Sequence, residues 1–383
     1  MADGPRLSRR DLLATLAAAA GGFACRRPPP SKASGARFES FPIARLDGFV
    51  TPAADFFVRD HFGIPPEASL PADRWRIEIS GEVEQPLTLS LADLADLPKL
   101  DLPVTLECAG NGGRNGIGAP GGPRAWGGAS TATFQGVSLD AVLARARPRS
   151  STVEIVFEGA DSGSERGSLD RQLFARSVPL AAARSPQALL ATGMNGARLP
   201  VLHGGPLRVL FPGRYATDSV KWLRRIRAVS VPFDGFYQHR RYRKATDQDP
   251  EGQSLGELRV QCEITAPEPG DRLPGALLAD VVGVAWGGRG GVARVEVSAD
   301  GGQSFGVATF LDPPTTTAWR RWRWTFRPGH PGPRWIIARA TDAGGNSQPL
   351  ESDEELGISR SVSGPDRIQY ANNSVPVVPV IVT

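Results

Sequence analysis

Cysteine and histidine are scarce in this 383-residue chain, which has three cysteines and four histidines. No Cys-x-x-Cys-His motif is present for covalent haem, and no spare histidine pair in a small extra domain could hold a b-type haem. Basic runs interleaved with aromatic side chains are also missing, and acidic residues are spread through the whole chain, which argues against a nucleic-acid partner. After residue 37 there is no internal repeat and no low-complexity segment.

Glycine and proline are abundant, with 44 and 34 residues, and this favours turns and short strands over long helices. The formal net charge is only +4, but arginine far outnumbers lysine. Arginine-rich pockets often hold phosphate, sulfate or carboxylate groups by bidentate pairing. The composition therefore favours a globular chain of two or three domains with an anionic ligand.

The N-terminal segment has the pattern of an export signal. Residues 8–13 begin a twin-arginine motif, and residues 12–24 form an apolar stretch that is too short to span a membrane. We predict a twin-arginine signal peptide over residues 1–25, a proline-containing linker over 26–37 and a periplasmic location. Cys25 is a possible lipid-attachment site. Proteins on this route often fold around a cofactor before export.

The rest of the chain predicts an α+β protein of two domains. Residues 38–257 read as a mixed α/β domain, with strands expected at 74–81, 152–157 and 219–231, a helix capped by Ser90 and a helix over 139–147. Residues 258–383 contain alternating strands at 292–298, 319–326 and 335–340, separated by glycine turns. This spacing is typical of an immunoglobulin-like β-sandwich.

Cys108 is the residue with the most chemical information. It ends a strand-like apolar stretch and opens the glycine-rich loop 109–113. A thiolate suits soft or redox-active metals, and a glycine loop lets backbone amides approach an anionic cofactor. The same pattern also fits a buried structural cysteine. A disulfide with Cys262 is conceivable, but Cys262 lies in an alternating strand, which favours a buried Cys262 and an unbridged, metal-bound Cys108.

Several short motifs follow one another along the first domain. They are FFVRDH (56–61), CAGN (108–111), AWGGA (125–129), FQGVSL (134–139), MNG (194–196), LP (199–200), HGGPLR (203–208) and SVKWL (219–223). This ordered set resembles the sulfite oxidase family of molybdenum enzymes, from about residue 40 to the C-terminus. The C-terminal sandwich resembles the dimerisation domain of that family.

The resemblance implies a molybdenum–molybdopterin cofactor with Cys108 as the one protein ligand of the metal. A pterin that carries a phosphate needs cations and hydrogen-bond donors around it. The residues expected to bind the cofactor are Phe57, Arg59, His61, Cys108, Asp161, His203, Arg208, Ser219 and Lys221. The alternative interpretations are ordinary salt-bridge partners for the cations, structural roles for the histidines and a turn residue for Asp161. The apolar neighbours of Arg208 and Lys221 favour cofactor contact for these two even without the resemblance.

The resemblance also implies a substrate pocket formed by Arg59, Cys108, Arg114, Trp126 and Tyr242. Sulfite is a small dianion at neutral pH and suits an arginine-lined pocket. The implied reaction is oxygen-atom transfer that converts sulfite to sulfate, with the protein positioning the substrate and the cofactor supplying the chemistry. Because the chain has no haem motif, electrons are expected to pass to an external acceptor such as a c-type cytochrome. A homodimer through the C-terminal domain is implied as well.

One position departs from the family. An arginine usually stands five residues after the ligand cysteine, where this chain has Gly113, and Arg114 stands one residue later. This leaves open a molybdopterin-dependent reductase of sulfoxides or N-oxides. A binding protein of the same fold with altered activity is a further alternative.

Overall fold

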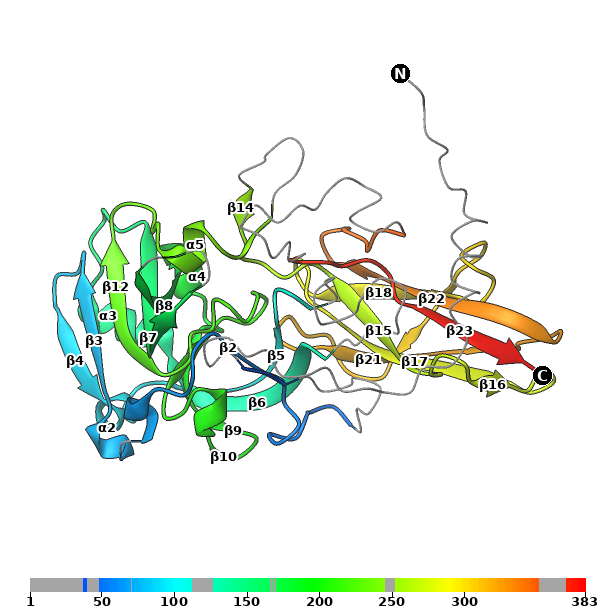
Figure 1. Cartoon of the computed structure of the whole chain (residues 1–383), viewed down its shortest axis with the longest axis horizontal. Coiled ribbons are helices and arrows are strands. Elements are labelled where there is room, and N and C mark those ends of the chain that lie inside the picture. Colours follow the sequence, from blue (N-terminus) through cyan, green and yellow to red (C-terminus); the bar gives the residue numbers. More distant parts are fainter. Residues whose placement is uncertain are drawn as a thin grey trace, which may run out of the picture.

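The computed structural model describes residues 37–39, 48–69, 71–111, 127–165, 168, 170–244, 252–350 and 370–383. Figure 1 shows two β-rich lobes side by side along the long axis of the molecule. The described part of the chain is mostly strand with few, short helices, so the α+β class is not confirmed. The predicted signal peptide with Cys25, and the predicted linker up to residue 36, lie outside the described residues.

The first lobe contains two five-stranded sheets. One has the order β10-β9-β6-β5 with β11 on β9, and comprises β5 (Lys99–Glu107), β6 (Ala129–Ser138), β9 (Leu189–Met194), β10 (Ala197–Arg198) and β11 (Arg208–Leu210). The other has the order β4-β3-β12-β7-β8, and comprises β3 (Arg76–Gly81), β4 (Leu87–Ser90), β7 (Glu154–Ser164), β8 (Arg171–Pro179) and β12 (Leu223–Val229). A separate pair, β1 (Arg37–Glu39) and β2 (Val58–Asp60), lies beside them.

Short helices connect these strands. They are η2 (Pro66–Ser69), η3 (Ala72–Arg74), α2 (Leu91–Leu94), α3 (Leu139–Ala146), α4 (Leu180–Ala183), η4 (Val201–His203) and α5 (Phe236–His239). Ser90 caps α2 by a capping box, as predicted. The longest, α3, confirms the helix expected near 139–147: the Ser138 hydroxyl accepts from the amide of Ala141, and Arg147 ends the helix in the left-handed conformation.

The second lobe is a two-sheet sandwich. One sheet has the order β15-β17-β21-β20 and comprises β15 (Gln261–Ala266), β17 (Ala279–Trp286), β20 (Thr309–Phe310) and β21 (Arg320–Phe326). The other has the order β16-β23-β22-β18-β19 and comprises β16 (Arg272–Leu273), β18 (Val292–Ser298), β19 (Gly306–Val307), β22 (Gly332–Asp342) and β23 (Val377–Val382). The predicted strands at 292–298, 319–326 and 335–340 correspond to β18, β21 and β22. Cys262 is fully buried in the core between the sheets.

The segment between the lobes forms the hairpin β13 (Arg243–Lys244) and β14 (Gln253–Ser254). A shared apolar cluster joins the lobes and includes Tyr237 and Tyr242 from the first, and Trp286 and Trp319 from the second. Among the described residues, no helix is both long and apolar enough to cross a membrane.

Candidate active site

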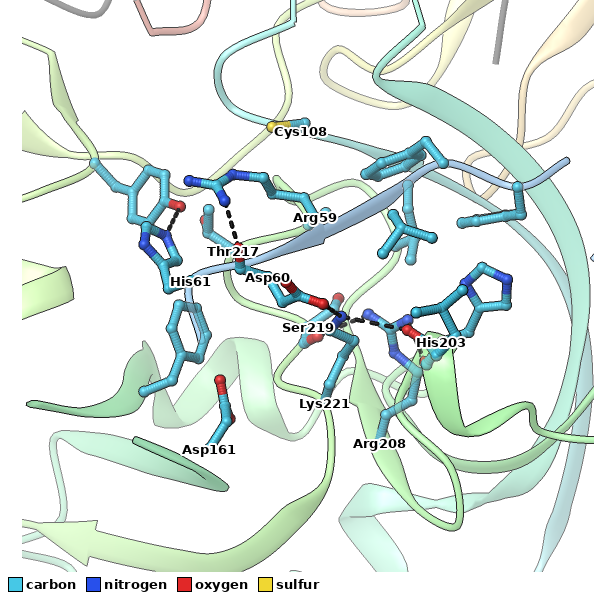
Figure 2. A pocket seen from close by; sticks show the side chains of 18 residues that line it. Arg59, Asp60, His61, Cys108, Asp161, His203, Arg208, Thr217, Ser219 and Lys221 are labelled. Atoms are coloured by element: carbon cyan, nitrogen blue, oxygen red, sulfur yellow. Dashed lines mark hydrogen bonds and ion pairs between the residues drawn. The ribbon is translucent and has the colours of Figure 1, made fainter. Parts of the chain in front are cut away.

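A cavity opens in the first lobe where β2, the end of β5, η4 and the segment before β12 meet. Figure 2 shows Arg59 extending toward Cys108, with Lys221, Arg208 and His203 grouped on the other side of β2. The cavity therefore combines one thiol with several cations.

Cys108 is the first residue after β5. Its amide donates to the carbonyl of Gly128 at 2.7 Å, and its carbonyl accepts from the amide of Asn111 at 2.8 Å. The thiol is buried and outside any disulfide. Burial raises the pKa of this thiol, and the nearby Arg59 guanidinium opposes that rise. A bound metal cation would favour the thiolate further.

Strand β5 lies between the cavity and the second lobe, and its successive side chains point alternately to one and to the other. Leu106 and Cys108 line the cavity. Thr105 and Glu107 point the other way: the Thr105 hydroxyl accepts from the amide of Trp319 at 2.7 Å, and the Glu107 carboxyl accepts from the indole of Trp286 at 2.9 Å. The second lobe therefore supports the strand that carries Cys108.

Arg208 is a buried cation of the cavity and Lys221 is a partly buried one. Arg208 donates to the carbonyls of His203 at 2.9 Å and Ser219 at 2.8 Å, and burial lowers its pKa to about 9. The Lys221 ammonium lies 3.6 Å from the Asp60 carboxylate, and burial lowers its pKa to about 8. Within the described residues no carboxylate forms an ion pair with Arg208. Its charge therefore suits an anion that enters the cavity.

Three buried polar atoms on the cavity wall have no hydrogen-bond partner. They are Nε of Arg208, Oδ1 of Asp161 and the hydroxyl of Thr217. Burial raises the pKa of Asp161 to about 7, with Lys221 opposing the rise. Buried polar groups normally find partners, so three orphaned atoms around one cavity indicate a polar ligand.

Backbone geometry brings the cationic residues together. Helix η4 ends at Gly204, whose φ of +104° is in the left-handed region. A Cβ on Gly204 would lie 2.9 Å from the Lys221 side chain, so the close approach of these two segments requires glycine. The fully buried pair of Arg176 and Asp218, 2.8 Å apart, fixes the segment that carries Ser219.

A hydrogen-bonded group of aromatic and charged residues forms the end of the cavity near Cys108. His61 Nε2 lies 2.5 Å from the Tyr242 hydroxyl, and His61 Nδ1 lies 2.5 Å from Glu165 Oε1. Glu165 also accepts from the Tyr237 hydroxyl at 2.8 Å and from Arg241 at 2.9 Å. Tyr242 has a φ of +41°, an unfavourable conformation for an aromatic residue that is typical of functional sites.

All ten predicted site residues that the structure describes line this one cavity. They are Phe57, Arg59, His61, Cys108, Asp161, His203, Arg208, Ser219, Lys221 and Tyr242. Arg114, Trp126 and the departure at Gly113 lie outside the described residues. The individual roles assigned to these side chains stay predictions.

Sequence reasoning missed four residues in or around the cavity: Asp60, Thr217, Glu165 and Tyr237. Asp60 and Thr217 lie inside or beside recognised motifs, and each could have been found from its neighbours. Glu165 and Tyr237 stand in stretches without a recognisable pattern. They reach His61 only through the fold.

The described residues hold no cluster of three or more His, Cys, Asp or Glu side chains that could bind a metal ion. A site with Cys108 as its single protein ligand would not form such a cluster. Its remaining ligands would have to come from a cofactor.

Comparisons with known proteins agree with this architecture. Residues 61–237 match the family model for an oxidoreductase molybdopterin-binding domain, and residues 253–356 match that for a Mo-co oxidoreductase dimerisation domain. The chain is 34% identical to sulfite oxidase of Gallus gallus over 340 residues, 82% of this chain and 71% of that protein.

Two further relatives extend the comparison. Mitochondrial sulfite oxidase of Rattus norvegicus is 36% identical over 330 residues, which is 80% of this chain but only 59% of the rat protein. The sulfane dehydrogenase SoxCD from Paracoccus pantotrophus superposes with a TM-score of 0.77 at 26% identity, covering 91% of this chain and 85% of that chain.

Proposed function

This chain belongs to the sulfite oxidase family of molybdopterin oxidoreductases, and from that premise we propose that it oxidises sulfite to sulfate in the cavity beside Cys108. The observation that carries the proposal is the Cys108 thiol facing a cavity that it shares with the Arg59 guanidinium. One thiol is available to a metal there, and a fixed cation is available to a small oxyanion.

The residues present fit the molybdenum–molybdopterin cofactor of the family. The partnerless atoms of Arg208, Asp161 and Thr217 offer donors and an acceptor to the polar rings and phosphate of a pterin. Lys221 adds a partly buried cation. Cys108 would bind the metal as a thiolate. When bound, the cofactor supplies the oxygen-atom transfer and the two-electron redox change.

The chain itself binds and orients the substrate. Arg59 is partly buried; burial lowers its pKa, but the surrounding Tyr242, Cys108 and Asp60 raise it more, so the guanidinium stays charged. In a cavity of low dielectric this charge attracts a dianion more strongly than it would in water. Oxidation of sulfite by water releases two electrons and two protons, so the site also needs groups that handle protons.

The surroundings of the reaction are part of the same proposal. We propose export to the periplasm by the twin-arginine route, electron transfer to an external acceptor such as a c-type cytochrome, and a homodimer. The match of residues 253–356 to a dimerisation domain supports the dimer, with the C-terminal sandwich as an immunoglobulin-like interface domain. The chain spans about three fifths of the length of the mammalian sulfite oxidases, so its electron acceptor is proposed independently of theirs.

The test is metal and pterin analysis of the purified protein, followed by a substrate screen. We expect about one molybdenum per chain and sulfite-dependent reduction of cytochrome c or ferricyanide. Faster oxidation of a sulfane-sulfur compound, or reduction of a sulfoxide or N-oxide, would redirect the proposal to those substrates. Absence of molybdenum would reject it.

Cys108→Ser is the matched variant for the metal ligand, because it replaces only the sulfur atom. We expect loss of sulfite oxidation. A Cys108→Ser protein that retains its cofactor and every measured rate would remove Cys108 from the site.

A further inference from the structure

The side chains of Glu165, His61 and Tyr242 form a linear hydrogen-bonded series that ends at the cavity. Glu165 follows β7, His61 follows β2 and Tyr242 follows α5, so three separate elements converge. The series has the form of an acid–imidazole–hydroxyl triad, in which the acid selects the tautomer of the imidazole. The hydroxyl at its end belongs to a predicted substrate-contact residue.

Glu165 can only accept hydrogen bonds in this arrangement. Three donors point at its carboxylate: the Tyr237 hydroxyl at 2.8 Å, Arg241 at 2.9 Å and His61 Nδ1 at 2.5 Å. Burial raises the pKa of Glu165. The hydrogen bond and charge of His61, helped by the Tyr237 hydroxyl and the charge of Arg241, outweigh burial and lower that pKa to about 2. The carboxylate therefore stays ionised, and His61 Nδ1 must carry a proton.

His61 is neutral at physiological pH. It is buried, and burial together with the positive charge of Arg59 lowers its pKa to about 4 although Glu165 opposes the shift. A neutral imidazole that has its proton on Nδ1 has a lone pair on Nε2. The only way for the Tyr242 hydroxyl to bond to that nitrogen is to donate its proton.

We propose that Glu165 is a positioning residue that holds His61 in the Nδ1–H tautomer and thereby directs the Tyr242 oxygen lone pairs into the cavity. Once the Tyr242 proton is committed to His61, the phenol oxygen can only accept on its free side. The site then combines a donor, Arg59, with an acceptor, Tyr242. That pairing suits an oxyanion accompanied by a water molecule that donates to the phenol.

The backbone supports this fixed orientation. Tyr242 is held at its positive φ by a hydrogen bond from the amide of Leu255 to its carbonyl at 2.8 Å, and its ring lies 5.9 Å from the buried guanidinium of Arg176. The ring is buried. The polarity of the hydroxyl is thus set by its partner His61 and not by rotation of the side chain.

The experiment is nitrogen NMR of the histidine-labelled, cofactor-loaded protein, which reports the protonation of each ring nitrogen. Only four histidines need assignment. We expect His61 as the Nδ1–H tautomer. His203 provides an internal reference of the opposite kind, because its Nε2 lies 2.7 Å from the Ala53 carbonyl and must donate to it. A doubly protonated His61, or an Nε2–H tautomer, would overturn the proposal.

Glu165→Gln tests the selection of the tautomer directly. Its amide can donate to Nδ1, so we expect His61 to change to the Nε2–H form while His203 stays unchanged. The matched control is Glu158→Gln, which removes a β7 carboxylate that pairs with Arg225 and Arg227 away from the cavity. An unchanged His61 tautomer in Glu165→Gln would contradict the role of Glu165. If that variant does not fold, the wild-type spectrum alone decides.

The effect on turnover rests on the proposed function and is measured separately. We expect Glu165→Gln to lower kcat for sulfite by about 10- to 100-fold with a smaller change in KM, and Glu158→Gln to match wild type. A changed tautomer with an unchanged kcat would show that turnover does not use the polarity of Tyr242 and would reject that part. The NMR result stands whether or not sulfite is the substrate, so failure of the two proposals can be told apart.

Discussion

Arg208 illustrates, at the scale of a single residue, how this site trades stability for ligand binding. Its guanidinium is buried, bonds to two backbone carbonyls and leaves Nε without a partner. Isolating a cation in this way is costly to the folded protein, and burial accordingly lowers its pKa to about 9. Such a cost is expected where an anion completes the pairing.

Arg208→Met should therefore separate stability from cofactor retention. Because the lost hydrogen bonds and the relieved burial of charge offset each other, we expect the stability of the cofactor-free protein to change by no more than about 1–2 kcal/mol. The pterin content of the purified protein should fall several-fold. Denaturant unfolding and pterin analysis measure the two effects.

Arg225→Met serves as the control, because Arg225 is half-exposed and pairs with Glu78 and Glu158 on the surface of β12. It should leave the pterin content unchanged. Equal pterin content in Arg208→Met and wild type would place the cofactor elsewhere.

Strand β5 is the element that links the two lobes to the site. It is the last strand in its sheet order, a position that tolerates Pro103. The second lobe covers its outer edge, where the amide of Thr105 donates to the carbonyl of Thr317 at 3.0 Å. Glu107 is buried against Trp286, and burial raises its pKa to about 7. Residues of the second lobe therefore support β5 on the side that faces away from the cavity.

Trp286→Phe is the test at this scale. It leaves one oxygen of the buried Glu107 carboxyl without its donor, so we expect a loss of about 1.5–3 kcal/mol of unfolding free energy. Trp324→Phe is the matched control, because that partly buried indole stacks on Phe326 far from β5. Similar losses from both substitutions would mean that the bond to Glu107 contributes nothing specific.

The sequence predicted local elements and most of the cavity, and it failed where contacts are long-range. Ser90 and the α3 region follow from neighbours within a few positions, and the cavity residues follow from motifs. Glu107 meets Trp286 across 179 positions, and Glu165 meets His61 across 104. No local pattern encodes such pairs. The helices are shorter than the α+β prediction implied because glycine and proline interrupt the chain so often.

For the molecule as a whole, two buried histidines and two buried carboxyl groups make stability depend on pH in opposite directions in the acid range. Burial lowers the pKa of His61 and His203 to about 4, so the unfolded chain binds their protons first and stability is lost as the pH falls below 6.5. Burial raises the pKa of Glu107 and Asp161 to about 7, so the folded chain holds their protons and stability is lost as the pH rises from about 4.5 to that value. Between about pH 4.5 and 6.5 the two contributions cancel.

In the cofactor-free protein, removing one group from either pair should change the pH dependence of stability, and the two changes should have opposite signs. Relative to wild type, we expect Asp161→Asn to gain stability as the pH rises from 4.5 to 6.5, and His203→Gln to lose it. The difference in each case is about 1.4 kcal/mol per pH unit. Denaturant unfolding across this range measures it, and parallel curves for the three proteins would contradict the opposition.

The alternation along β5 also constrains how the two lobes can be recombined. A chimera that joins the first lobe of this chain to the sandwich of a relative would exchange Trp286 and Trp319 while keeping Glu107 and Thr105. The crossover would be made between residues 244 and 252, far along the chain from Thr105 and Glu107. Its effect would instead appear at Glu107, next to Cys108, because Trp286 donates from its side chain whereas residue 319 donates from its backbone. A side-chain donor at position 286 is therefore the design rule for such hybrids.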